Sequence, residues 1–175
     1  EEDKKQDKTA RFHILLGEAY VLWTKYEEGE RNLLKGLRMT NRFPSSGRLR
    51  PAITFFSSTI SYFAVRAGQK IWPRWSHKRE DHLLASRGYA RLMEVMYHKG
   101  ETLLSTCYAM QALVEAQKGG DSKELAEALT PIGNLCFFLG MRTSAKKVFN
   151  RASTLIVDRE SEFNGHYVYL VKTTY

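Results

Sequence analysis

The chain has 175 residues, of which 43% are hydrophobic and 26% are charged, so it is long enough and apolar enough to bury a core. Its formal net charge is +8 at pH 7, and it opens with the polar run EEDKKQDK rather than with an N-terminal signal. Its two cysteines, Cys107 and Cys136, are too few and too far apart for a disulfide framework or a zinc site, so we expect buried free thiols and a reducing compartment, the cytoplasm.

Residues 1–8 are expected to form a polar lead-in, and residues 9–39 a first helical hairpin. The spacing of three and four between apolar residues is typical of one face of a helix. In the first helix these residues are Phe12, Leu15, Leu16, Ala19, Tyr20 and Trp23. The second helix begins near Tyr26, and we expect it to bury Leu33, Gly36 and Leu37.

Residues 40–80 are predicted to be a basic loop followed by one long inserted helix. The loop TNRFPSSGR contains the Pro, Ser and Gly that stop a helix, and Pro51 suits the first turn of the next one. We expect a single helix over 51–72 that buries four apolar residues against the hairpins: Ile53, Phe56, Ile60 and Phe63. The uncharged part of this segment is too short and too polar to span a bilayer.

Two further hairpins are predicted, at residues 81–118 and 121–157. Ser76 or Asp81 is expected to start the first helix of the first of these hairpins, and Gly119 and Gly120 separate the two hairpins. Asp121 and Glu124 have the spacing of a capping box, whereas Pro131 should kink or split the helix near Leu129. Residues 161–175 are expected to begin another hairpin, cut short, through Phe163, Tyr167, Leu170 and Val171.

The hairpins repeat a pattern of large and small residues. Aligning Leu16 with Ile132 matches Gly17 with Gly133, Leu33 with Phe149 and Gly36 with Ala152, and a further copy is predicted around Leu92, so the copies lie at offsets of 76 and 40 residues. We therefore expect Gly17, Gly133 and Ala145 to lie where two helices approach closely. The pattern resembles the tetratricopeptide repeat, although its offsets differ from the usual spacing of about 34 residues. The predicted fold is all-α: antiparallel helical hairpins in a tetratricopeptide-like solenoid segment with one long inserted helix.

A closer resemblance is carried by three phrases. They are LLGEAYVLWTKYEEGERNLLKGLRM, YARLMEVMYHKGETLLSTCYAMQALVEA and LAEALTPIGNLCFFLGMRTSAKKVFNRA. Their order is similar to the helical-repeat region of large signalling ATPases of the soluble adenylyl cyclase type. The resemblance implies a segment of a longer chain whose cyclase and ATPase residues belong to other domains. Pro131 departs from the expected helix interior there.

The positive charge is concentrated in one quarter of the sequence. The stretch from Arg31 to Arg79 holds eleven Arg and Lys and no Asp or Glu, which leaves 16 basic and 19 acidic residues elsewhere. Such an asymmetry indicates partners rather than fold. The candidate partner-binding residues, in which Trp interleaves with a basic face, are Arg66, Lys70, Arg74, Trp72 and Trp75. This mixture serves single-strand binders and protein interfaces alike, and a solvated face remains the plainer interpretation.

No catalytic, cofactor-binding or metal-binding residue is predicted. The five histidines have no ligand partner at metal spacing, and Ser57, Ser58 and Thr59 have no histidine near them in sequence. We therefore expect a non-catalytic scaffold that binds other domains of its parent protein or an acidic protein partner, without a membrane span. The alternative is a nucleic-acid-binding helical repeat that uses the stretch from Arg31 to Arg79.

Overall fold

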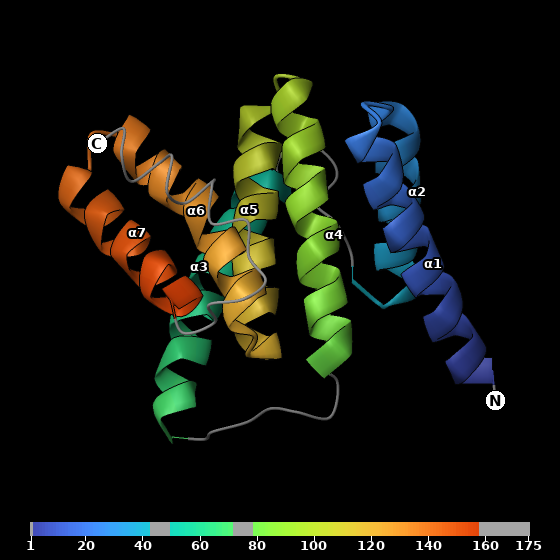
Figure 1. Ribbon diagram of the computed structural model, residues 1–175, viewed down its shortest axis with the longest axis horizontal. Helices are drawn as coiled ribbons and strands as arrows, with labels where there is room; N and C mark the ends of the chain where they lie inside the picture. The colour runs from blue at the N-terminus through green and yellow to red at the C-terminus, as the bar shows by residue number, and fades with distance from the viewer. Residues whose placement is uncertain (1, 43–49, 72–78, 158–175) are drawn as a thin grey trace.

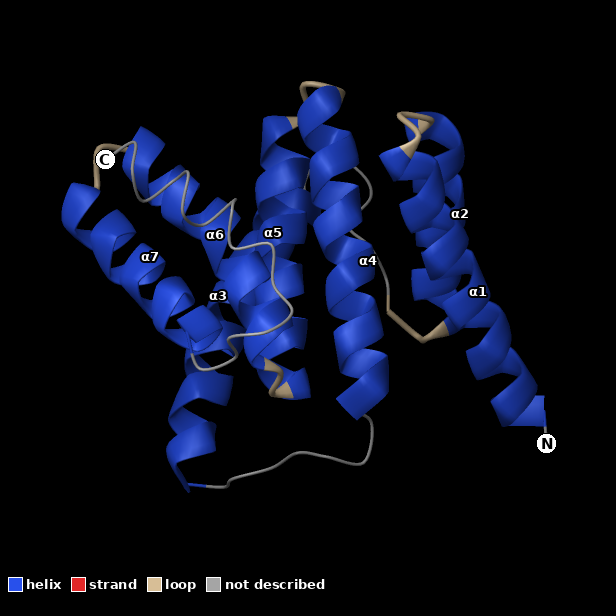
Figure 2. Ribbon diagram, in the orientation of Figure 1, coloured by secondary structure: helices blue, strands red, loops and turns tan. Residues whose placement is uncertain are grey.

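The computed structural model describes residues 2–42, 50–71 and 79–157, and every regular element within these ranges is an α-helix (Figures 1 and 2). The elements are α1 (Glu2–Leu22), α2 (Tyr26–Met39), α3 (Arg50–Ile71), α4 (Arg79–His98), α5 (Thr102–Gly119), α6 (Ser122–Phe138) and α7 (Arg142–Val157). The predicted all-α class is therefore confirmed. The further hairpin predicted at 161–175 lies outside the described residues.

Three pairs of helices form antiparallel hairpins: α1 with α2, α4 with α5, and α6 with α7. The hairpins lie in a row, with α1 and α2 at one end and α6 and α7 at the other (Figure 1). Helix α4 contacts both helices of the first hairpin, and α6 contacts both helices of the second. This arrangement is compatible with the predicted stack of hairpins, whereas its tetratricopeptide-like character stays a prediction.

The turns inside the three hairpins share one backbone geometry. Each has a residue of positive φ: Thr24 at 61°, Gly100 at 77° and Gly140 at 76°. In each turn the next residue donates its backbone N–H to the carbonyl five positions earlier, at 2.9 Å. The three positive-φ residues are separated by 76 and 40 positions. These are the offsets predicted from the large and small residues, so the repeat in the sequence corresponds to a repeat in the backbone.

Close helix contacts lie at the predicted small residues. A Cβ added to Gly17 would lie 2.7 Å from Leu33 Cγ, and one added to Gly133 would lie 2.7 Å from Phe149 Cζ. Leu33 and Phe149 are themselves matched positions of the first and third hairpins. Ala145 is 2% exposed. Because real Cβ atoms do not approach heavy atoms so closely, the glycines set the separation of the two helices in these hairpins.

The core runs through the row of hairpins and joins them. Its largest fully buried side chains come from α1, α2, α4, α5 and α6: Ile14, Leu33, Leu37, Leu92, Leu113 and Leu129. Ion pairs also connect neighbouring hairpins. Arg91 pairs with Glu18 at 3.0 Å, Arg87 with Glu124 at 2.8 Å, and Lys99 with Glu30 at 2.6 Å. Apolar burial and charge pairing therefore hold the three hairpins in one register.

Several details differ from the expectations. Helix α1 begins at Glu2, so the polar lead-in is helical. The Glu, Lys and Gln of this segment are good helix formers. In addition, Gln6 Nε2 donates a hydrogen bond of 3.1 Å to the Met39 carbonyl at the end of α2. Helix α6 runs through Pro131 without a break, so the predicted split is not observed. Cys107 is buried as expected and is in no disulfide, whereas Cys136 is only half-buried.

The inserted helix is confirmed, but its predicted orientation is wrong. Helix α3 lies behind α5 in Figure 1 and packs on it. The four side chains expected in the core are 61–69% exposed: Ile53, Phe56, Ile60 and Phe63. The face towards the protein instead carries a buried Ser58 and half-buried Phe55 and Tyr62. Both faces have helical spacing, and the less apolar face, which carries Ser58, is the one that is buried.

Candidate functional site

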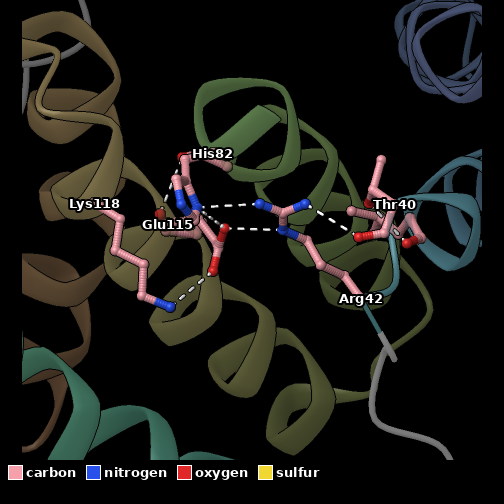
Figure 3. Close-up of polar contacts among 8 residues, drawn as sticks. Thr40, Arg42, His82, Glu115 and Lys118 are labelled. Carbon is pink, nitrogen blue, oxygen red and sulfur yellow. Dashed lines mark hydrogen bonds and ion pairs between the residues drawn. The ribbon is translucent and has the colours of Figure 1, made fainter. Parts of the chain in front are cut away.

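A cluster of charged side chains joins the end of the first hairpin to the second (Figure 3). Arg42 follows α2, His82 lies in the first turn of α4, and Glu115 and Lys118 lie one turn apart on α5. Arg42 Nε donates to Glu115 Oε2 at 2.9 Å, and His82 Nδ1 lies 2.8 Å from the same oxygen. Lys118 Nζ lies 3.3 Å from the other carboxylate oxygen. One carboxylate therefore meets three nitrogen-bearing groups.

The electrostatics of Glu115 follow from these contacts. Burial acts to raise the pKa of this carboxyl, but the hydrogen bond from His82 and the charges of Arg42 and Lys118 outweigh it and lower the pKa to about 2. A carboxylate can only accept, so the proton between His82 and Glu115 resides on Nδ1. The Glu115 carboxyl thus stays ionised at neutral pH, and its contacts bind two hairpins together.

A polar pocket of about 150 Å³ lies beside this network. Its lining comes from α3, α4 and α5: Ser57, Ser58, Ser61, Tyr89, Gln111, Val114, Glu115 and Lys118. Burial raises the pKa of Tyr89 far above its ordinary value, so its phenol stays neutral. The Gln111 Oε1 atom is buried and accepts no hydrogen bond from a described residue. A polar pocket of this kind suits ordered water or a small ligand that donates hydrogen bonds.

The pocket brings Ser57 and Ser58 near a histidine-bearing network, which sequence spacing did not show. His82 directs Nδ1 to Glu115, and the same nitrogen lies 3.0 Å from an Arg42 nitrogen. Both short contacts of this imidazole therefore lie within the ion network.

Across the described ranges, no group of three or more His, Cys, Asp and Glu side chains is arranged to hold a metal ion.

The predicted partner-binding residues fall at the edge of the described chain. Arg66 and Lys70 lie in the second half of α3, and the structure does not describe the positions of their side chains. Trp72, Arg74 and Trp75 lie outside the described residues. Their proposed grouping on one face stays a prediction.

Other members of the basic stretch are divided between two roles. Arg42 pairs with Glu115, and Arg79 pairs with Asp121 at 3.3 Å. Arg31, Lys35 and Arg38 are exposed along one face of α2, three and four residues apart. Part of the positive stretch therefore holds the hairpins together, and part of it faces solvent.

Two rows of exposed apolar side chains were not predicted. The first lies on α3 and consists of Ile53, Phe56, Ile60 and Phe63; we call it the α3 ridge. The second, which we call the α1 row, lies on α1 and on Trp23 directly after it; the exposed fractions are 59% for Phe12, 43% for Leu15, 63% for Leu22 and 66% for Trp23. Periodicity had marked most of these residues as apolar, but it does not show which of two apolar faces meets the core.

Comparisons with protein-family models, with curated proteins and with solved structures found no match to this chain. Among the described helices, none is both long enough and apolar enough to cross a membrane.

Proposed function

We propose that this chain is a non-catalytic helical-hairpin module of the tetratricopeptide-like kind. It binds protein partners or other domains of a larger cyclase- or ATPase-type signalling protein in the cytoplasm. The sequence resemblance motivates the parent-protein context, and the row of hairpins motivates the binding role, because stacked helices present extended surfaces to a partner.

One observation carries this proposal. Large apolar side chains remain exposed in rows on two helices rather than singly, on α1 and along the α3 ridge. Isolated exposed apolar residues are ordinary, whereas grouped ones mark sites where proteins associate. The α3 ridge has two Phe side chains and the α1 row has a Phe and a Trp, and aromatic residues are favoured at interfaces.

The competing proposal is a nucleic-acid-binding repeat that uses the basic stretch. The exposed basic face of α2 with Arg31, Lys35 and Arg38 supports it. The positions of Arg42 and Arg79 count against it, because these side chains form ion pairs with Glu115 and Asp121. Protein binding accounts for the exposed apolar rows, and polyanion binding does not.

Site-specific photocrosslinking in cells tests the proposed function. A photoreactive phenylalanine analogue replaces Phe12 on α1 or Phe63 on α3, and a matched control carries it at exposed Lys147 on α7. We expect a defined protein to be crosslinked from at least one apolar row and not from the control position. Its purified form should then bind the chain, and substitution of the crosslinking row by serine should weaken that binding.

Two results would count against protein binding. In the first, all three positions crosslink the same background set of proteins. In the second, the chain crosslinks mainly to RNA under ultraviolet light through the stretch from Arg31 to Arg79, which would favour the nucleic-acid alternative.

A further inference from the structure

The polar pocket beside the Glu115 network lies where the inserted helix α3 meets the second hairpin, and we call it the α3–α5 pocket. Three of its polar residues are buried: Ser58 is 8% exposed, Tyr89 is 4% exposed and Glu115 is 9% exposed. Ser57 on α3 is exposed, and Lys118 on α5 is half-buried. The pocket therefore combines a buried polar part with a side that reaches solvent.

The volume of the α3–α5 pocket admits a molecule larger than water. It is about 150 Å³, roughly ten times the room that one water needs. An apolar cavity of about this volume takes up benzene. In the α3–α5 pocket, however, Val114 is the one apolar residue of the lining. An apolar molecule would leave the surrounding polar groups without hydrogen bonds, so a suitable ligand is polar.

The charges around the pocket favour a neutral ligand. The Glu115 carboxylate and the Lys118 ammonium group lie 3.3 Å apart in its lining. An anion would approach the carboxylate, and a cation would approach the ammonium group. Arg42 and His82 contact the other oxygen of Glu115, so this carboxylate already has its counter-charge. An ion in a partly buried site without a counter-ion of its own loses hydration that nothing replaces.

The hydrogen-bonding groups of the pocket require a ligand that both donates and accepts. Gln111 Oε1 is buried and accepts no hydrogen bond from a described residue, and a buried acceptor is costly to leave unpaired. Lys118 can only donate, and the Tyr89 phenol keeps its proton because burial raises its pKa. The serine hydroxyls can do either. A hydroxyl group on the ligand matches all of these partners, because it also donates and accepts.

We propose that the α3–α5 pocket binds a small neutral polyol, a molecule in which neighbouring carbon atoms carry hydroxyl groups. One hydroxyl group donates to Gln111 Oε1, and its neighbours exchange hydrogen bonds with the serines of α3 and with Lys118. The pocket shares no residue with the two apolar rows, so polyol binding and the proposed protein binding are tested independently.

Two four-carbon alcohols provide the probe. Erythritol and butane-1,4-diol both carry hydroxyl groups at their ends, and erythritol alone has two more between them. Each is titrated into the full chain, and binding is followed by ¹H–¹⁵N NMR. We expect erythritol to bind with a dissociation constant of about 1 mM or below, and butane-1,4-diol to bind at least about tenfold more weakly. Equal affinity of the two alcohols, or no saturable binding of erythritol, would overturn the proposal and leave ordered water as the occupant.

Two charged probes test the preference for a neutral ligand. Acetate offers a carboxylate, and methylammonium offers a small cation that donates hydrogen bonds. Both should bind at least about tenfold more weakly than erythritol at physiological salt. Tighter binding of either ion at this pocket would replace the polyol by an ion and contradict the proposal.

A bound polyol should also hold α3 against the second hairpin. Ser58 and Ser61 belong to α3, whereas Gln111 and Glu115 belong to α5, so hydrogen bonds to both sets connect the two helices. A ligand that binds the folded arrangement stabilises it. Hydrogen exchange of the backbone amides of α3 should therefore slow at saturating erythritol. Exchange that stays unchanged would contradict binding between these helices.

Matched substitutions locate the binding. Gln111→Leu removes the buried acceptor and should weaken erythritol by about tenfold. Gln6→Leu makes the same change on α1, at an exposed position that does not line the pocket, and should leave the affinity unchanged. Circular dichroism checks that both variants are folded. If Gln111→Leu is not, Ser61→Ala provides the second variant and should weaken erythritol by about threefold, with Ser144→Ala on α7 as its exposed control. An equal loss in a variant and its control, or no loss in the pocket variant, would refute binding at this pocket.

Discussion

The Glu115 network makes the strongest quantitative prediction about stability. Its carboxyl is only 12% exposed, so water screens its interactions with Arg42 and His82 weakly. The pKa falls from an ordinary value of 4.5 to about 2 in the folded chain. A shift of this size corresponds to about 3 kcal/mol in favour of folding at neutral pH. Replacing Glu115 with Gln should therefore destabilise the chain by about that amount.

The sign of the pH dependence follows from the lowered pKa. The unfolded chain binds a proton at Glu115 near pH 4.5, and the folded chain does so only near pH 2. The stabilisation is complete above pH 4.5 and is lost as the pH falls towards 2. About 2 kcal/mol of it should be gone at pH 3. The amide of the Glu115→Gln variant cannot titrate, so the difference in stability between the two proteins should narrow over this interval.

Urea unfolding followed by circular dichroism between pH 7 and pH 3 gives the free energy of unfolding of both proteins. Glu101→Gln, at an exposed position before α5, is the matched control and should change it by less than about 0.5 kcal/mol. A difference between wild type and Glu115→Gln that stays constant over this pH range would refute the reasoning. It would show that packing, and not the charge of the carboxylate, accounts for the loss.

Three further predictions concern other parts of the chain. Ala145→Phe should overpack the third hairpin and cost about 1–3 kcal/mol, and an unchanged melting temperature would contradict the close contact there. Tyr62→Phe removes the acceptor of Arg151 and should cost about 1 kcal/mol by urea unfolding, with the helical content unchanged. Binding to single-stranded RNA should be weak and lost near physiological salt in a filter-binding titration; submicromolar binding at about 150 mM salt would favour the nucleic-acid alternative.

The hairpins were predictable because their signals are local. Each turn is set by a few residues, and Gly100 and Gly140 occupy positive-φ positions that few other residues accept. The small residues Gly17 and Gly133 then indicate where helices meet. Sequence periodicity combined with these positions was enough to give the register of three hairpins.

The orientation of α3 and the ion network were not predictable in the same way. Helix α3 has two periodic faces, and the choice between them depends on what α5 and α7 present to it. The network depends on pairs far apart in the chain: 73 positions separate Arg42 from Glu115, and 33 separate His82 from it. A lone glutamate in the apolar sequence of α5 was the available signal, and it did not identify its partners.

The position of α3 in the chain has a consequence for biosynthesis. The ribosome produces α3 before α5 and α7, the helices that support it, and 89 positions separate Tyr62 from its partner Arg151. During that interval both faces of α3 are without their final neighbours, and the nascent chain presents Phe55, Phe56 and Tyr62 together. Cotranslational chaperones that recognise aromatic segments should therefore engage this chain early and release it only after the third hairpin has formed.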